Sequence, residues 1–272
     1  MIGQNNLLNS IHLMLAQGTF PRVILLSGDS GSGKKTIARE IAKQIGGHSY
    51  KCGIKVDDIR DLIALANKTT DKIVYLLADI DTMSLSAKNA LLKLTEEPPK
   101  NAYIIMTAED ENNVLDTIKS RAVRFSMDKY TPDEIIEYAQ SLERGLTPEE
   151  LDIVANICNT PGEVQKLVDL GVIEFWEYVD KVIDNIAKVS DANSFKIADR
   201  IAFKSDSDGY DLKLFWRAFM MLCTERMTFN LDEKVKYAEW IKITSRALQQ
   251  TRNKSINLQM LFDMWIVSIR GE

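Results

Sequence analysis

The sequence predicts an α/β fold with a parallel sheet over residues 1–127, followed by two segments that are entirely helical. Up to Phe125, short apolar runs alternate with stretches of helical periodicity. The strand signal then ends, and two Thr-Pro-x-Glu sequences, at Thr131 and Thr147, are typical helix starts. From about Phe175 the chain has no proline and almost no glycine, so we expect helices to its end.

The elements of the first segment follow from its apolar patterns. Apolar residues at helical spacing predict a helix over residues 5–17, which Gly18 ends. Continuous apolar runs are typical of parallel strands that are buried on both faces. They predict strands at residues 23–26, 72–77 and 102–107. We also expect a short strand at 123–125 and a further short strand within 50–56. Helices should lie between them, and a ligand should lie at the carboxyl ends of the strands.

We divide the chain into three domains. They are an α/β domain at residues 1–127, a lid-like domain of three short helices at 128–172, and an all-α domain at 173–272. The last domain holds all four tryptophans and the segment FWRAFMML. Aromatic residues and methionines at helical spacing predict core packing there and not a cofactor site.

Composition excludes several classes of protein. The formal net charge of −5 argues against a strongly basic nucleic-acid binder, although a local basic patch remains compatible with it. The three cysteines, Cys52, Cys158 and Cys223, are far apart and odd in number, which predicts neither a metal site nor a disulfide framework and favours a reducing cytoplasm. We find no signal pattern and no apolar run long enough to span a membrane.

A glycine-rich loop between an apolar strand and a helical stretch predicts a phosphate-binding site. Glycines allow backbone N–H groups to surround an anion, and the helix that follows points its positive end at the same place. Lys34 follows the loop and can reach terminal phosphates, which favours this reading over a purely structural turn. The predicted nucleotide-binding residues are Gly28, Asp29, Ser30, Gly31, Ser32, Gly33, Lys34, Lys35 and Thr36.

The loop departs from the full pattern at one position. The pattern has Ser or Thr after the lysine to bind Mg²⁺, and this chain has Lys35, which offers no acceptor. Thr36 lies one residue later, about 100° further around the helix, so it is not a simple substitute. The sequence therefore predicts no metal ligand in the loop.

Several separated segments together resemble bacterial clamp-loader subunits of the AAA+ class, of the gamma and delta-prime type. The segments are Ile2-Gly3-Gln4, GDSGSGK, VDDIRDLI, KIVYLLADIDTM, NALLKLTEEPP at 89–99 and IKSRA at 118–122, of which the fifth is the most specific. The resemblance implies an α/β ATPase module, a helical lid and a helical collar domain that assembles into a pentameric ring. The implied partners are other clamp-loader subunits, a sliding clamp and primer-template DNA. Bacterial members usually carry a four-cysteine zinc module, which is missing here and fits a compact phage-type or divergent subunit.

The resemblance also implies roles for residues outside the loop. Ala78 stands where the family has the aspartate that orients magnesium. Asp79 stands in the place of the water-activating glutamate, one methylene shorter, and we leave catalysis and a solvated strand-end acid as alternatives. Pro161-Gly162 occupy the place of the lid arginine.

Ser120-Arg121 resembles the family motif that presents an arginine finger to ATP in the adjacent subunit. The alternative is a surface arginine that pairs with Asp116 or Glu111. Glu96 and Glu97 fall in the last turn of a helix, where a negative charge is unfavourable, so they are either solvated or paired with a fixed group.

These observations lead to one preferred function and two alternatives. The preferred function is a clamp-loader subunit of delta-prime character within a DNA polymerase III holoenzyme, which binds ATP or ADP without clear support for magnesium, hydrolyses ATP weakly or not at all, and offers Arg121 in trans. The first alternative is a self-contained AAA+ ATPase motor that forms its own ring, with Thr36 and Asp79 as metal ligand and base. The second is a P-loop phosphotransferase, against which the NALLKLTEEPP segment speaks.

Overall fold

The chain forms two compact units, which we describe separately. The computed structural model describes residues 2–66, 72–186, 196–198, 200–202, 210–230, 232–251 and 256–271. The first unit comprises Met1–Tyr130 with Thr160–Gly162, and the second comprises Thr131–Asn159 with Glu163–Glu272. The predicted division of the second part into domains at 128–172 and 173–272 stays a prediction. No helix of the described residues is both long and apolar enough to cross a bilayer.

The first unit is built on a five-stranded parallel sheet with the strand order β2-β3-β4-β1-β5. Its strands are β1 (Val23–Ser27), β2 (His48–Cys52), β3 (Ile73–Leu77), β4 (Ala102–Ala108) and β5 (Val123–Ser126). The predicted parallel sheet is confirmed, and β2 begins slightly before the range expected for it. Every pairing is parallel, as in the register of Val23 with Ile104 and of Ile24 with Val123.

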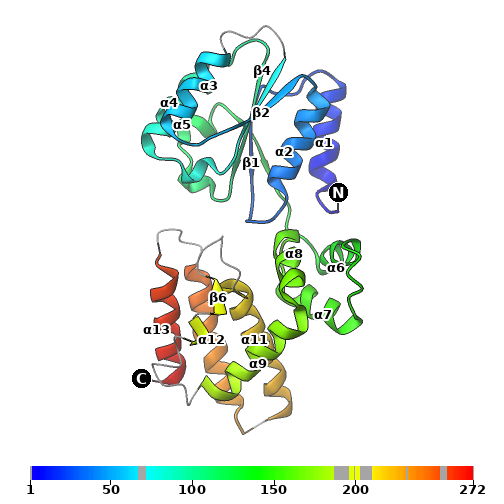
Figure 1. Ribbon diagram of the computed structural model, residues 1–272, viewed down its shortest axis with the longest axis vertical. Helices are drawn as coiled ribbons and strands as arrows, with labels where there is room; N and C mark the ends of the chain where they lie inside the picture. The colour runs from blue at the N-terminus through cyan, green and yellow to red at the C-terminus, as the bar shows by residue number, and fades with distance from the viewer. Residues whose placement is uncertain are drawn as a thin grey trace. The chain divides into compact units, whose positions relative to one another are not determined.

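Helices cover both faces of this sheet (Figure 1). They are α1 (Asn5–Ala16), α2 (Lys34–Ile45), α3 (Val56–Ala66), α4 (Leu85–Glu96) and α5 (Asp116–Lys119), with the short 3₁₀ turns η1 (Ile80–Thr82) and η2 (Glu111–Asn113). Leu25 and Ile104 pack with α3, α4 and α5, whereas Ile24 and Ile105 pack with α1 and α2. Because side chains alternate across a strand and both faces are covered, the inner strands β1, β3 and β4 read as nearly continuous apolar runs. The outer strands β2 (HSYKC) and β5 (VRFS) are largely exposed.

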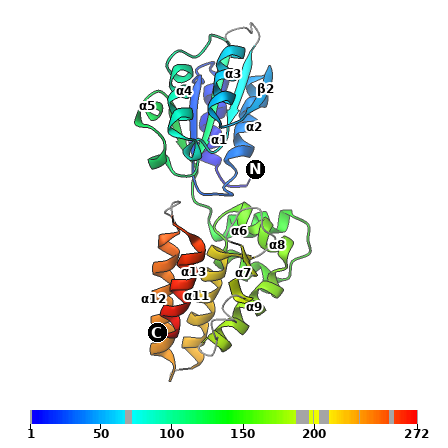
Figure 2. The ribbon, with the colours of Figure 1, turned by 60° about the vertical axis from the view of Figure 1, so that its left-hand side comes forward.

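The second unit is mainly helical (Figure 2). Its described elements are α6 (Pro132–Ser141), α7 (Pro148–Ile157), α8 (Pro161–Leu170, whose first two residues group with the first unit), α9 (Val172–Asn185), β6 (Ile201–Ala202), β7 (Tyr210–Asp211), α11 (Leu212–Phe229), α12 (Lys234–Gln250) and α13 (Leu258–Arg270). Thr131 and Thr147 both form complete capping boxes, as the sequence predicts. The parallel pair β6–β7 departs from the all-helical expectation. Two-residue strands are too short to leave a period in the sequence.

Aromatic side chains form the core of the second unit. Trp265 is 2% exposed and contacts the rings of Phe215, Phe219 and Trp216. Its indole N–H donates to Thr244 Oγ1 at 2.9 Å, so the polar atom of this buried ring is satisfied. The aromatic stripe is therefore packing, as predicted from its helical spacing.

Candidate functional site

The glycine-rich loop lies at the carboxyl edge of the sheet. It follows β1 and leads into α2, while Asp79 follows β3 and Glu109 follows β4. Since β3, β4 and β1 are neighbours in the sheet, the segments after them meet at one place. This is where parallel α/β sheets bind ligands, and where the sequence predicts a phosphate site.

The loop keeps backbone donors available for an anion. Gly31 and Gly33 have φ angles of +75° and +93°, which favour glycine because a side chain would be strained there. Gly33 is the N-cap of α2, and no side chain caps this helix start. The Ser32 hydroxyl is buried without a partner among the described residues, while its carbonyl accepts from Tyr130 Oη at 2.8 Å. These features fit a phosphate group.

Lys34 places a buried ammonium inside the loop. Its side chain reaches back to donate to the carbonyls of Gly28 and Asp29, both at 2.7 Å. Burial lowers the pKa of Lys34 below its ordinary 10.5, an effect that the nearby carboxylates of Glu109 and Asp79 partly oppose. A phosphate oxygen would offer this cation a charged partner in place of neutral carbonyls.

The lowered pKa of Lys34 predicts a pH dependence of phosphate binding. A bound phosphate favours the charged lysine, which is lost as the pH rises through a folded-state pKa below 10.5. Affinity for nucleotide should therefore fall on the alkaline side before pH 10.5 is reached, as measured by calorimetric titration. Lys43→Met, on an exposed part of α2, should keep this decline, and Lys34→Met should bind weakly at every pH. A wild-type affinity that stays level up to pH 10.5 would contradict the prediction.

Lys35 and Asp79 form an ion pair. Lys35 Nζ lies 2.6 Å from Asp79 Oδ2, and the two side chains are 52% and 33% exposed. Asp79 adopts a left-handed conformation with φ +56°, which aspartate tolerates better than most residues. Its N–H donates to Thr107 Oγ1 at 3.0 Å, and its carbonyl accepts from Thr82 Oγ1 at 2.7 Å. The carboxylate is thus held in place and engaged by a cation from the chain itself.

The residues around the loop do not fit a magnesium ion. Lys35 brings a positive charge to the position from which the loop pattern supplies a hydroxyl. Ala78 has no ligand atom, and Thr36 is exposed on the first turn of α2. Across the described ranges, no group of three or more His, Cys, Asp or Glu side chains is arranged to hold a metal. Magnesium therefore has no place in the chemistry that we derive for this site.

Arg121 forms a second candidate site. It follows α5, and its guanidinium donates to the carbonyl of Thr117 at 2.8 Å and pairs with Glu96 Oε1 at 2.8 Å. The alternative partners expected from the sequence are wrong, because Asp116 pairs with Lys119 and Glu111 pairs with Arg124. Glu96 at the end of α4 is accordingly paired, one of the two alternatives for it.

The two sites lie at opposite edges of the same sheet, where the carboxyl ends of the strands form one edge and the amino ends form the other. Arg121 comes just before β5, whose first residue Val123 is level with Ile24 near the start of β1. The glycine-rich loop begins after Ser27, at the other end of β1. At about 3.3 Å per strand residue, this separation is roughly 15 Å, so Arg121 does not reach its own loop.

The sequence left some of these residues unidentified. Thr107 accepts a hydrogen bond from the backbone N–H of Asp79 and so fixes that segment. What could have indicated this role in the sequence is a hydroxyl residue at the end of an otherwise apolar strand. Tyr130 supports the loop through Ser32 from almost a hundred residues away, which no local pattern reveals. The pairing of Lys35 with Asp79 spans 44 positions and was equally hidden.

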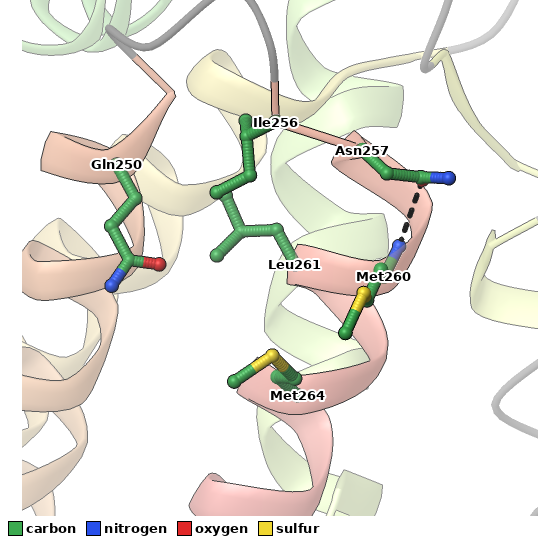
Figure 3. Close-up of a pocket in the computed structure, with 6 residues that line it drawn as sticks. All are labelled: Gln250, Ile256, Asn257, Met260, Leu261 and Met264. Atoms are coloured by element: carbon green, nitrogen blue, oxygen red, sulfur yellow. Dashed lines mark hydrogen bonds between the residues drawn. The ribbon is translucent and has the colours of Figure 1, made fainter.

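The C-terminal helix carries an apolar groove (Figure 3). A cavity of about 420 Å³ is lined by Gln250, Ile256, Asn257, Met260, Leu261 and Met264. Met260 and Met264 are 62% and 56% exposed, and Val267 continues the same side of α13. Spacings of four and three residues place these three side chains on one helix face.

Solved structures define the class of fold. A gamma-subunit-related protein of DNA polymerase III from Thermotoga maritima covers 96% of this chain and 98% of its own, with a TM-score of 0.50 at 16% identity. A variant of RuvB from Thermotoga maritima covers 96% and 80%, with a TM-score of 0.53 at 17% identity. At these identities the likeness shows the fold alone, which is an α/β AAA+ module with a helical C-terminal region.

Sequence comparisons indicate which class of protein this chain resembles. Residues 47–131 match the family model described as DNA polymerase III, delta subunit. Subunit gamma of Buchnera aphidicola subsp. Schizaphis graminum is 30% identical over 194 residues, which are 58% of this chain and 53% of that protein. Subunit delta' of Bacillus subtilis is 30% identical over 96 residues, which are 35% of this chain and 29% of that protein. The chain spans about half or less of these relatives. The matches support a clamp-loader-type AAA+ subunit.

Proposed function

We propose that this chain is a clamp-loader subunit of delta-prime character, which helps to load a sliding clamp on primer-template DNA in the cytoplasm. It holds a nucleotide, hydrolyses it poorly or not at all, and lends Arg121 to ATP in an adjacent subunit of a pentameric ring. The arrangement of charged groups supports the proposal. The carboxylate of Asp79 beside the chain's own loop is engaged by Lys35, while Arg121 lies at the opposite edge of the sheet. Its relatives are named as gamma, tau and delta' subunits of DNA polymerase III.

The first half of the proposal concerns the chain's own loop. Lys34 and the backbone donors of the loop bind phosphate oxygens. Hydrolysis also needs a carboxylate that is free to orient a water molecule against the terminal phosphate. Asp79 instead accepts from Lys35 at 2.6 Å, so its carboxylate is already engaged by a cation of the chain itself. The site therefore binds without efficient turnover.

The second half concerns Arg121. Its side chain is 35% exposed, and that of its present partner Glu96 is 49% exposed. A phosphate of the adjacent subunit carries more negative charge than this carboxylate and can accept two parallel bonds from a guanidinium. An arginine supplied in trans stabilises the charge that spreads over the transferred phosphate and raises the rate by roughly 10³–10⁵-fold.

The test is reconstitution. The purified chain is mixed with separately purified, ATPase-active subunits of the same loader, and ATP turnover and clamp loading on primed DNA are measured. We expect no turnover at loader rates from the chain alone and a clear rise when it joins the mixture. Turnover by the chain alone that Asp79→Ala abolishes would support the self-contained motor instead. Transfer of phosphate to a small molecule would support the phosphotransferase.

The groove on α13 is part of the same proposal as an assembly surface. Met260, Met264 and Val267 expose an apolar face of a helix in the domain that the resemblance assigns to the ring's collar. Met264→Asp should weaken association with the other subunits by at least about tenfold, or ~1.4 kcal/mol, because it places a charge in a desolvated contact. Sedimentation velocity measures this effect. Val235→Asp, at an 81% exposed position on α12, is the matched control and should assemble normally. Equal assembly of both variants would exclude this face.

A further inference from the structure

Lys35 occupies the position at which a phosphate-binding loop normally supplies a metal ligand. We propose that its ammonium takes the place of the divalent cation, so that the loop binds nucleoside triphosphates and diphosphates free of metal. This inference rests on the proposed nucleotide binding and adds the form of the ligand. It concerns the chain's own loop and is independent of Arg121.

The first argument is the position of the ammonium. Lys35 is the second residue of α2, directly after the lysine of the loop. Its Nζ lies 2.6 Å from Asp79 Oδ2, the carboxylate that follows β3. A magnesium ion in such a loop bridges a residue at this helix position and the phosphates. The ammonium of Lys35 thus lies next to the protein groups that such a metal ion would contact.

The second argument is that the ammonium is both held and accessible. Asp79 is fixed through its N–H to Thr107 and through its carbonyl to Thr82. Lys35 is nevertheless 52% exposed, so a ligand can reach it. An ammonium has three N–H donors, and among the described residues Asp79 is the acceptor that Lys35 contacts. Donors therefore remain for phosphate oxygens.

The third argument is charge. Lys34 and Lys35 bring two positive charges to adjacent positions of the loop. One of them neutralises Asp79, whose carboxylate would otherwise repel a polyphosphate. In a metal-dependent site the cation performs both tasks, neutralising the carboxylate and the phosphates. A second cation of charge +2 between Lys35 and the phosphates would meet the ammonium directly, so added magnesium gives no benefit here.

The test compares nucleotide binding by the full chain with and without metal. Binding of ATP and ADP is titrated by calorimetry in excess EDTA and in excess Mg²⁺. The wild-type protein should bind at least as tightly in EDTA as in Mg²⁺, because excess Mg²⁺ chelates the nucleotide and lowers the concentration of its metal-free form. Lys35→Thr should lose about tenfold or more in EDTA and regain affinity when Mg²⁺ is added, because a hydroxyl and a freed carboxylate then stand together. Lys35→Arg, which keeps the charge, should behave as wild type in both solutions.

Controls make each outcome decisive. Lys43→Thr, at an exposed site of the same helix, should behave as wild type, and circular dichroism of every variant checks its fold. Loss of wild-type binding in EDTA overturns the inference, as does Lys35→Thr binding that equals wild type in EDTA. Absence of binding under both conditions overturns the inference together with the nucleotide-binding half of the proposed function. Stimulation of partner turnover through Arg121 is measured separately and distinguishes that case from failure of the loader role.

Discussion

Replacing Arg121 with alanine should lower ATP turnover of the reconstituted assembly by roughly 10³–10⁵-fold at the site that it serves. Under the proposed function the guanidinium stabilises charge on the adjacent subunit's phosphate, and alanine leaves that charge without this donor. Turnover is measured at saturating ATP with equal amounts of assembled complex. This chain's own nucleotide affinity should not change, because its loop lies at the opposite edge of the sheet.

Two variants separate this role from a structural one. Arg124→Ala removes a 56% exposed arginine three residues away and should leave turnover unchanged. Glu96→Gln removes the negative charge that pairs with Arg121 and should maintain or raise turnover, since it weakens the hold on the guanidinium. If Glu96→Gln lowers turnover as much as Arg121→Ala does, the Arg121–Glu96 pair has a structural role, and the proposed role of Arg121 at the adjacent subunit's ATP is wrong. Arg121→Lys should recover little, because a lysine lacks the planar pair of donors.

Replacing Arg217 with methionine should destabilise the second unit by about 3–5 kcal/mol. Arg217 of α11 makes two bonds of 2.8 Å to Glu163 of α8 and donates to the carbonyl of Ile157 at the end of α7. Both charged side chains are largely buried, at 14% and 18% exposed. The variant leaves the Glu163 carboxylate buried without its cation, which is the costly part of breaking such a pair.

Urea unfolding followed by tryptophan fluorescence measures this loss. All four tryptophans lie at or after position 176, so the signal reports on the second unit alone. The double variant Glu163→Gln with Arg217→Met should recover part of the stability, because no charge is then left unpaired. Lys181→Ala breaks an exposed pair with Glu177 on α9 and should stay within about 0.5 kcal/mol of wild type. An equal loss of stability from Arg217→Met and from Lys181→Ala would contradict the prediction, because the buried pair would then contribute no more than the exposed one.

Local patterns were enough to predict the sheet and the loop. Strands buried on both faces are apolar at nearly every position, and Ile24 and Leu25 show this directly, since they face opposite helix layers. The helix starts at Thr131 and Thr147 were predictable because a capping box is complete within four residues. The loop could be found because strand, glycines and lysine are contiguous.

Contacts between distant segments were not predictable in the same way. Departures at Lys35 and Ala78 indicated a weakened metal site, but the bond from Lys35 to Asp79 depends on the turn after β3, where Asp79 takes a positive φ. Glu96 and Arg121 come together because α4 returns to the amino edge of the sheet, and only the completed topology shows this. In the sequence, Arg217 is a charged residue within the aromatic segment FWRAFMML, and nothing near it indicates its partner on α8.

The parallel sheet gives the first unit a direction. Each strand has one carboxyl end, so the loop with Lys34 and the segment with Arg121 belong to two different surfaces. A contact in which Arg121 of one subunit serves the loop of the next joins unlike surfaces and is heterologous. Such contacts cannot be satisfied within a two-fold dimer in which each partner presents the same patch, and they propagate until a ring closes or the series ends. Under the proposed function, a chain inside a closed ring therefore has two different neighbours, one that accepts its arginine and one that faces its loop.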